Sequence, residues 1–289
     1  MDTLAHSRYE LHVEREGAQE RKKHKSYADV YFSDIDEAEE IAAETAEDPV
    51  GYVHSFDVGS TVDGPGIRFT LFLTGCPLRC LYCHNPDTWH KRNGRAIRLS
   101  RMLKKIAKYE RVLKISGGGL TISGGEPVQQ HAFTTRIFKH CKAMGIHTCL
   151  DTSGRLGASL SDAELMDIDL NLLDIKSGDP QIYQRVTGQP LEPTLAYARR
   201  LSDLGRPMWV RYVLVPGLTD GHDNIEKVAD ICAGLKSLER VEILKFHQMG
   251  ADKWAKLGID YQLADTQPPA PELVERVREQ FRSRGLKVF

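Results

Sequence analysis

The 289-residue sequence lacks the features that are typical of membrane proteins, secreted proteins and nucleic-acid-binding proteins. It has no run of 18 apolar residues and no apolar segment near its N-terminus, so we expect no membrane-spanning helix and no secretory signal, and we predict a cytoplasmic location. Its net charge is only −1, which gives no general reason to expect nucleic acid or a membrane surface as a partner. Six cysteines in a chain of this length do not form the framework of a disulfide-stabilised secreted domain.

The charge that is present is unevenly distributed. Residues 1–50 hold 14 acidic and 6 basic side chains, a net of −8, whereas residues 51–289 hold 33 basic and 26 acidic ones, a net of +7. We predict that residues 1–50 form an acidic, partly disordered extension, with one short helix from Ser33 to about Thr45. The alternative is a docking or targeting segment, and its charge would favour contact with the +7 body.

From residue 51 onward, short apolar runs alternate with amphipathic stretches. The runs that predict strands are 68–74, 120–122, 146–151, 170–175, 208–215 and 241–246, and the stretches that predict helices are 99–109, 130–144, 161–166, 193–204, 224–235 and 271–284. Because parallel strands need a long crossover, this alternation predicts an α/β fold: a partial (β/α)6 TIM-like barrel over residues 51–289, with outer helices. Functional side chains are then expected at the carboxyl ends of the strands.

Three cysteines follow the first of these predicted strands, in the pattern Cys76-x3-Cys80-x2-Cys83. Three nearby thiolates suit a soft metal or an iron–sulfur cluster, and three ligands would leave one iron of a four-iron cluster open for a substrate. A structural zinc site with His84 is the alternative, but such sites usually combine two separated ligand pairs, and a ferredoxin-like carrier would need a fourth cysteine. Cys141, Cys149 and Cys232 lie in apolar patterns and are expected to be buried.

With the neighbouring motifs, this loop resembles the radical S-adenosylmethionine superfamily, and within it the activating enzymes of glycyl radical enzymes, most closely the pyruvate formate-lyase type. The resemblance covers about 51–289 and excludes residues 1–50. Besides the cysteine loop it rests on motifs that begin at His54, Thr61, Tyr82, Ser116, Ser123, His147 and Lys253. Only 40 residues, His84 to Ser123, separate the cysteines from Ser123-Gly124-Gly125-Glu126, and they hold no cysteine, which leaves no room for the additional clusters of many relatives.

The resemblance implies one [4Fe-4S] cluster on Cys76, Cys80 and Cys83, and S-adenosylmethionine beside it. Residues implied to bind that cofactor are Tyr82, His84, Gly124, Gly125, Glu126, Asp174, Lys176 and His247. Residues implied to hold a monovalent cation are Asp151, Thr152, Asp174 and the carbonyl of Leu172, and those implied to face a peptide substrate are Asp63, Arg68 and Arg211. No side chain beyond these ligands is assigned a catalytic role.

Simpler interpretations exist for several of these residues. Glu126 fits an ordinary strand-to-helix turn, Asp174 and Lys176 fit an ion pair, His247 fits a satisfied hydrogen-bonding group, and Asp63 precedes a Gly-Pro-Gly turn.

The implied reaction is reductive cleavage of S-adenosylmethionine to methionine and a 5′-deoxyadenosyl radical, which takes hydrogen from a glycine of a partner glycyl radical enzyme. Pyruvate formate-lyase is the predicted partner, under anaerobic conditions, and a flavodoxin- or ferredoxin-like protein is the predicted electron donor. We predict a monomer that binds neither nucleic acid nor membrane. The competing hypotheses are activation of a different glycyl radical enzyme and, from another class, a cysteine-rich metal-binding protein without catalysis.

Overall fold

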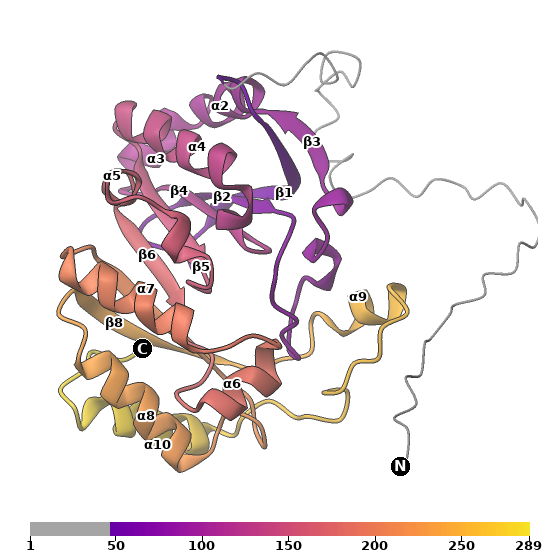
Figure 1. Cartoon of the computed structure of the whole chain (residues 1–289), viewed down its shortest axis with the longest axis vertical. Helices are drawn as coiled ribbons and strands as arrows, with labels where there is room; N and C mark the ends of the chain where they lie inside the picture. Colours follow the sequence, from indigo (N-terminus) through magenta and orange to yellow (C-terminus); the bar gives the residue numbers. More distant parts are fainter. Residues whose placement is uncertain (1–46) are drawn as a thin grey trace, which may run out of the picture.

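The computed structural model describes residues 47–289, so the predictions for residues 1–46 lie outside the described residues. One eight-stranded sheet organises this part of the chain, in the order β3-β1-β2-β4-β5-β6-β7-β8 (Figure 1). The strands are β1 (Val50–Ser60), β2 (Arg68–Leu73), β3 (Arg95–Arg98), β4 (Gly119–Gly124), β5 (His147–Thr152), β6 (Leu170–Asp174), β7 (Met208–Leu214) and β8 (Leu238–Lys245). In this part of the chain no helix is both long and apolar enough to cross a bilayer.

Helices follow most of the parallel strands. The α-helices are α2 (Leu99–Ala107), α3 (Glu110–Ile115), α4 (His131–Ala143), α5 (Asp162–Met166), α6 (Pro180–Thr187), α7 (Glu192–Asp203), α8 (His222–Ala233), α9 (Ala251–Lys256) and α10 (Pro271–Arg282). Short 3₁₀ turns are η2 (Pro86–Thr88), η3 (Lys91–Asn93), η4 (Pro127–Gln130) and η5 (Gly157–Ser159). The six predicted helices are all present, each within a few residues of its expected bounds.

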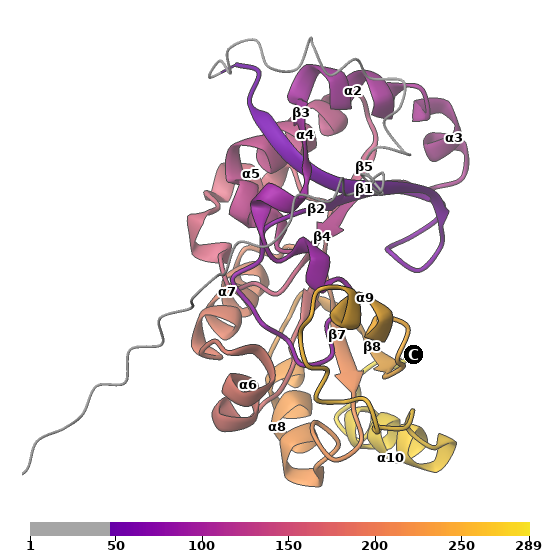
Figure 2. The same ribbon diagram turned by 90° about the vertical axis from the view of Figure 1, so that its right-hand side faces the viewer.

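The predicted partial barrel is confirmed. Strands β2, β4, β5, β6, β7 and β8 pair in parallel with their neighbours, and the sheet remains open, with β3 and β8 at its two edges. Figure 2 shows the sheet curving from β1 and β2 to β7 and β8, with α4 to α8 on its outer side. Because all six parallel strands run the same way, their carboxyl ends meet at one end of the barrel.

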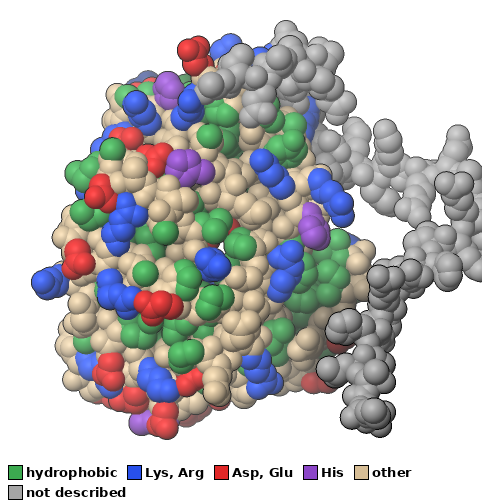
Figure 3. All heavy atoms as spheres, viewed as in Figure 1, with side chains coloured by type: hydrophobic (Ala, Val, Ile, Leu, Met, Phe, Trp, Pro, Cys, Tyr) green, Lys and Arg blue, Asp and Glu red, His purple; other side chains and the backbone are tan. Residues whose placement is uncertain are grey.

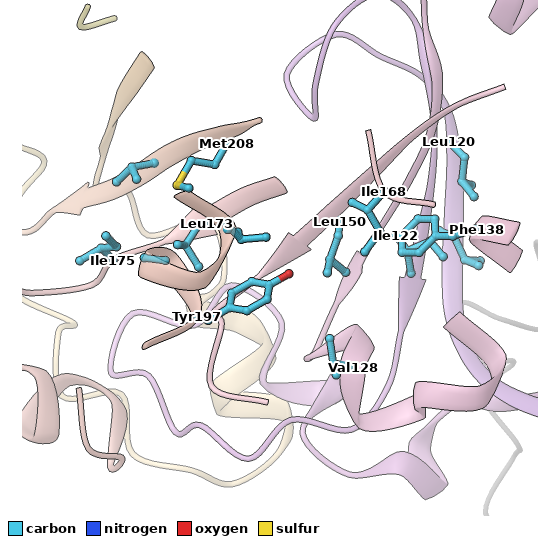
Figure 4. Close-up of a cluster of buried hydrophobic side chains, with 14 of the residues drawn as sticks. Leu120, Ile122, Val128, Phe138, Leu150, Ile168, Leu173, Ile175, Tyr197 and Met208 are labelled. Carbon is cyan, nitrogen blue, oxygen red and sulfur yellow. The ribbon is translucent and has the colours of Figure 1, made fainter. Parts of the chain in front are cut away.

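The core lies between the outer face of this sheet and the helices. Figure 4 shows Ile122 on β4, Leu150 on β5 and Leu173 on β6 lying in one layer with Phe138 of α4 and Tyr197 of α7. Alternate strand residues face this layer, which leaves the other half of each strand to face the barrel interior. The single hydroxyl in the layer is satisfied, because Tyr197 donates to Asn171 Oδ1 at 2.9 Å.

Strands β1 and β3 were not predicted from the sequence pattern. Strand β1 pairs antiparallel with both β2 and β3 and covers the edge that β2 would otherwise expose. Its half-exposed pattern includes His54, Ser55 and Asp57, which interrupt the apolar signal. Helix α6 was also missed, although Asp179 caps its N-terminus by accepting from the amides of Gln181 and Ile182, with Pro180 at its first position.

Candidate cofactor site

A cavity of about 630 Å³ opens at the carboxyl ends of the parallel strands. Most of the predicted site residues line it: Cys76, Cys80, Tyr82, Cys83, His84, Gly124, Gly125, Asp151, Thr152, Asp174, Lys176, Arg211 and His247. They come from the ends of six strands that span 171 residues of sequence. The expectation that functional side chains gather at this end of the barrel is therefore met.

The cysteine loop, residues 75–85, connects β2 to η2 and lies along one wall of the cavity. It is held by backbone hydrogen bonds from Arg79 N to Thr187 O at 2.8 Å and from Leu81 N to Val186 O at 2.9 Å, at the end of α6. All three cysteines are free thiols and line the cavity. Burial raises the pKa of each thiol, that of Cys80 to about 12. The three cysteines therefore ionise to thiolates only when they bind a cation.

Two tryptophans brace the end of the cysteine loop. Trp254 of α9 donates its indole N–H to the carbonyl of Cys83 at 2.8 Å, and its ring lies edge-on to that of Trp89, with centroids 5.1 Å apart. Trp89 in turn accepts from the amide of Cys76 at 3.1 Å. Neither residue had been assigned a role from the sequence, although Lys253-Trp254 belonged to the motifs that carried the resemblance.

The segment that carries Trp254 is tied to the turn after the cysteines by charge. Lys253 Nζ donates to Asn85 Oδ1 at 2.7 Å and to Asp87 Oδ1 at 3.1 Å. Asp87 also pairs with His54 Nε2 at 2.9 Å, which connects β1 to the same turn. Although burial acts to raise it, the pKa of Asp87 is lowered, chiefly by the hydrogen bond with His54 and the charge of Lys253. The carboxylate of Asp87 thus links β1 and α9 to the turn that follows the cysteines, an arrangement called here the Asp87 clamp.

The two predicted histidines stack on each other beside the cysteines. The rings of His84 and His247 are 4.2 Å apart at 28°, and His84 Nε2 lies 3.2 Å from the carbonyl of His247. This stacking directs His84 toward His247, which disfavours the alternative of a zinc ion on three cysteines and His84. Burial and the neighbouring His247 lower the pKa of His84, so the ring is neutral at pH 7.

Two polar atoms in the cavity wall have no hydrogen-bond partner among residues 47–289. They are the hydroxyl of Tyr82 and Nδ1 of His247, both buried. Since buried polar groups in folded proteins are nearly always satisfied, both atoms are poised to bond a ligand in the cavity. This places the two predicted cofactor-binding residues where a polar ligand would reach them.

Glycines allow the chain to pass close beneath the cavity. Gly124 has φ +112°, a conformation that L side chains rarely adopt, and a Cβ on Gly125 would lie 2.4 Å from Gly75 O. The adjoining Glu126 does not line the cavity. Its buried carboxylate accepts from Thr152 Oγ1 at 2.7 Å and from Ser153 N at 3.0 Å. Both oxygens of Glu126 are thus bonded within the chain, and Ser123, Gly124 and Gly125 line the cavity beside it; the cofactor contact of Glu126 stays a prediction.

Asp174 and Lys176 form the ion pair that was the simpler interpretation, with Lys176 Nζ 2.9 Å from Asp174 Oδ2. Both also line the cavity. Burial acts to lower the pKa of Lys176, but Asp174 and the neighbouring Tyr82 and Cys80 raise it well above its ordinary value, so the lysine stays charged. Its Nζ lies 5.5 Å from the centre of the Tyr82 ring, close to the cysteine loop. The pair thus sets a fixed positive charge beside the three thiols.

The residues predicted to hold a monovalent cation lie near one another but are partly occupied. Asp151 accepts from Ser123 Oγ at 2.6 Å and lies 3.4 Å from Arg211 Nη1, and the hydroxyl of Thr152 is used by Glu126. Leu172 pairs in register with Asp151 on the neighbouring strand, but it is fully buried and does not line the cavity. Burial raises the pKa of Asp151 to about 6, against the charge of Arg211, so a nearby cation would favour its ionised form.

The three residues predicted to face a peptide differ in their burial and in their contacts. Arg211 lines the cavity and pairs with Asp63 at 3.7 Å and with Glu242 at 3.2 Å, besides Asp151. Asp63 lies on the loop 61–67, which joins β1 to the start of β2, and its carbonyl accepts from Thr121 Oγ1 at 2.6 Å. Arg68, however, is fully buried, and donates to Thr121 Oγ1 at 2.9 Å and to Leu120 O at 2.5 Å. Its prediction as a peptide contact is corrected to that of a residue inside the barrel that supports the loop, because no part of it reaches the surface.

Comparison with known proteins agrees with this arrangement. Residues 70–230 match the family model described as the Radical SAM superfamily. The chain belongs to the radical SAM superfamily. Membership implies a [4Fe-4S] cluster and S-adenosylmethionine, and the three thiols, the orphaned Tyr82 and His247 atoms and the glycine-lined backbone are chemically suited to hold them.

The radical SAM relatives include "Pyruvate formate-lyase-activating enzyme" of Staphylococcus epidermidis, 43% identical over 235 residues that cover 78% of this chain and 92% of the relative. "Pyruvate formate-lyase 1-activating enzyme" of Escherichia coli K12 is 39% identical over 242 residues, which cover 83% of this chain and 98% of the relative. Among solved structures, Streptococcus suis SuiB bound to S-adenosylmethionine matches 74% of this chain and 47% of its own, with 18% identity and a TM-score of 0.55. That last likeness supports the fold alone.

Proposed function

We propose that this chain activates pyruvate formate-lyase under anaerobic conditions, by generating a glycyl radical in that enzyme. The observation that carries the proposal is the single cavity in which three cysteines, an unpaired Tyr82 hydroxyl and the charged Lys176 converge. Relatives that bear the corresponding name align over nearly their whole length with this chain. When bound, the cluster and S-adenosylmethionine supply a carbon radical that removes hydrogen from a glycine of the partner.

In this proposal the protein binds, orients and shields the reacting groups. Cys76, Cys80 and Cys83 hold the cluster. The backbone of Gly124 and Gly125 lets the amino-acid portion of the cofactor approach β4 closely, while the remaining contacts come from the cavity wall: Tyr82, His84, Asp174, Lys176 and His247. Glu126 positions Thr152 and Ser153, and thereby the end of β5.

The peptide substrate enters, in this proposal, beneath the loop 61–67. Asp63 and Arg211 hold that loop against the cavity, with Arg211 Nη2 donating to Val62 O at 2.5 Å. A flexible glycine-containing segment of the partner would replace some of these contacts. Arg68 supports the same loop from below by donating to Pro65 O at 3.2 Å.

The finer assignments complete the proposal. Asp151, Thr152, Asp174 and the Leu172 carbonyl hold a monovalent cation beside the cofactor carboxylate, which requires Arg211 to release Asp151. A flavodoxin- or ferredoxin-like protein supplies the electron, and the enzyme acts as a cytoplasmic monomer. The removal of residues 1–46, which precede the described residues and carry most of the acidic charge of residues 1–50, is expected to weaken the response of activity to salt.

The test is anaerobic reconstitution with iron and sulfide, followed by reduction and addition of S-adenosylmethionine. We expect 5′-deoxyadenosine to form and, with pyruvate formate-lyase present, a glycyl radical doublet in electron paramagnetic resonance. Cys80→Ala should abolish both signals, whereas Cys141→Ala, a buried cysteine outside the cavity, should keep them. A doublet only with a different glycyl radical enzyme would redirect the partner assignment, and stoichiometric zinc without 5′-deoxyadenosine would reject the function.

A further inference from the structure

Trp89 connects the cysteine loop to an exposed part of the chain. Its backbone carbonyl accepts from the amide of Cys76 at 3.1 Å, and Trp89 lines the same cavity as Cys76 and Cys83, two of the three proposed cluster ligands. The guanidinium of Arg79 lies 4.9 Å from the ring centre and donates to Cys76 O at 2.8 Å. The ring itself is only partly buried. A molecule that contacts Trp89 from outside is therefore separated from the proposed cluster ligands by this residue alone.

The chain that follows Trp89 is exposed and basic. His90, Lys91 and Arg92 are all exposed, as is Arg79 on the other side of the ring. The basic segment, residues 88–109, contains eight Lys and Arg side chains and no Asp or Glu. Six of the eight lie on β3 and on or just after α2, so the exposed cations next to Trp89 are Arg79, Lys91 and Arg92. In Figure 3, the right-hand part of the face shows Lys, Arg and His side chains with few Asp or Glu, whereas basic and acidic side chains are mixed on its left and lower parts.

A surface of this charge beside a redox site favours one kind of partner. Clustered charge of one sign raises the association rate of an oppositely charged protein by 10- to 1,000-fold, and the effect decreases with salt. Trp89 also lines the cavity that holds the three cysteines, so a carrier in contact with its ring is close to the proposed cluster.

We propose that a small acidic one-electron carrier protein docks on the surface formed by Arg79, Trp89, His90, Lys91 and Arg92. One electron leaves the reduced carrier and enters the cluster beside Trp89, and no bond forms or breaks. This docking surface rests on the proposed function, since it requires the cluster. Its residues lie outside the loop 61–67, the segment proposed to face the peptide substrate.

The experiment compares two reductants on the reconstituted enzyme by stopped-flow spectroscopy: a fully reduced acidic flavodoxin, and dithionite. The variant is Lys91→Glu with Arg92→Glu. The matched control is Lys139→Glu with Lys236→Glu, an equal charge change at exposed positions on α4 and after α8. At low salt we expect the flavodoxin rate constant to fall at least tenfold in the variant and less than twofold in the control, with dithionite rates unchanged.

Salt provides the second readout. The flavodoxin rate of the wild-type enzyme should fall as salt rises, and that of the Lys91/Arg92 variant should be nearly flat. An unchanged flavodoxin rate in the variant, an equal loss in the control, or a parallel loss with dithionite would each overturn the docking surface. If the wild-type chain takes up no cluster at all, the proposed function fails instead, and the two failures are distinguishable.

Discussion

Two buried arginines inside the same barrel have opposite surroundings. Arg68, at the start of β2, is bonded by neutral acceptors, namely a threonine hydroxyl and backbone carbonyls. Arg211, on β7, is surrounded by Asp63, Asp151 and Glu242. Burial lowers the pKa of Arg68, whereas the carboxylates around Arg211 raise its pKa although burial acts to lower it. The first arginine therefore serves as a structural hydrogen-bond donor, and the second balances charge at the site.

The surroundings of the two arginines also differ in where they lie along the strands. Arg68 lies near the end where the parallel strands begin, fully buried. Around Arg211, the carboxylates of Asp63, Asp151 and Glu242 converge, and with Asp174 they outnumber the buried cations Arg211 and Lys176. This excess of negative charge suits an end that receives a cationic sulfonium cofactor, and it makes that end responsive to mutation and pH in ways that the other end is not.

The largest expected effect is on stability, from Arg68→Met. The substitution leaves the hydroxyl of Thr121 and the carbonyls of Leu120 and Pro65 without their donor in a dry interior, so we expect a loss of about 3–5 kcal/mol in the free energy of unfolding. Urea denaturation of the cofactor-free chain measures it, with exposed Arg92→Met as the control, expected within about 0.5 kcal/mol of wild type. Equal stability of the two variants would contradict the structural role.

Arg211→Gln should affect reaction more than folding. Its carboxylate neighbours are able to take up protons, so the stability loss is smaller, but the loop 61–67 loses its anchor at Val62 and Asp63. We expect the rate of glycyl radical formation to fall at least tenfold, while 5′-deoxyadenosine formation without the partner changes less than threefold. Arg211→Lys, which keeps the charge, should recover part of the loss. Equal loss of both products in the Gln variant would place Arg211 in cofactor cleavage rather than in substrate positioning.

Trp254→Phe tests the brace on the cysteine loop. Phenylalanine keeps an aromatic ring but loses the N–H donated to Cys83, a contribution of about 1 kcal/mol. We expect iron to be lost to a chelator about fivefold faster, and the reduced cluster to give broader paramagnetic resonance lines. Trp209→Phe is the matched control, because its indole donates to Glu239 Oε2, away from the cysteines, at the same 2.8 Å. Identical chelation rates in the two variants would show that the bond does not hold the loop.

The smallest expected effect is a pH dependence. Burial raises the pKa of Asp151 to about 6 from an ordinary 3.8, so the folded chain binds more protons than the unfolded chain between these values. The contribution of Asp151 therefore makes the free energy of unfolding decrease as pH rises from about 4 to 6. Asp151→Asn should flatten this part of the profile in a buffer without Na⁺ or K⁺. A profile with the same slope in wild type and variant would assign the effect to other groups.

The sequence predicted those parts of the molecule that carry a local pattern. The six parallel strands and the cysteine loop follow from apolar runs and spacing, and the fold class follows from their alternation. Side-chain direction had no such signal. Glu126 adjoins two glycines that face the cavity, yet it turns away to cap η4 and to bond the end of β5, 26 residues later. Arg68 resembles Arg211 as a charged residue in a strand, and only the packed neighbours reveal that one is enclosed by carbonyls and the other by carboxylates.

Contacts between the two ends of the open sheet also could not be predicted, because they join residues that are far apart in the sequence. The clamp of Asp87 with His54 and Lys253 joins segments 33 and 166 residues away. Helix α9 has only six residues, too few for a periodic signal, although its Trp254 reaches the cysteine loop.

The bond from Trp254 to Cys83 has a consequence for biogenesis, because it spans 171 residues. A ribosome adds about 5–20 residues per second, so on the order of ten to thirty seconds separate the synthesis of the three cysteines from that of the helix that braces them. During that interval the thiols belong to a nascent chain in which helix α9, with Trp254, has not yet been synthesised. Insertion of iron and sulfide therefore belongs to the time after nearly all of the chain has been made, and until then the thiols depend on reducing surroundings for their integrity.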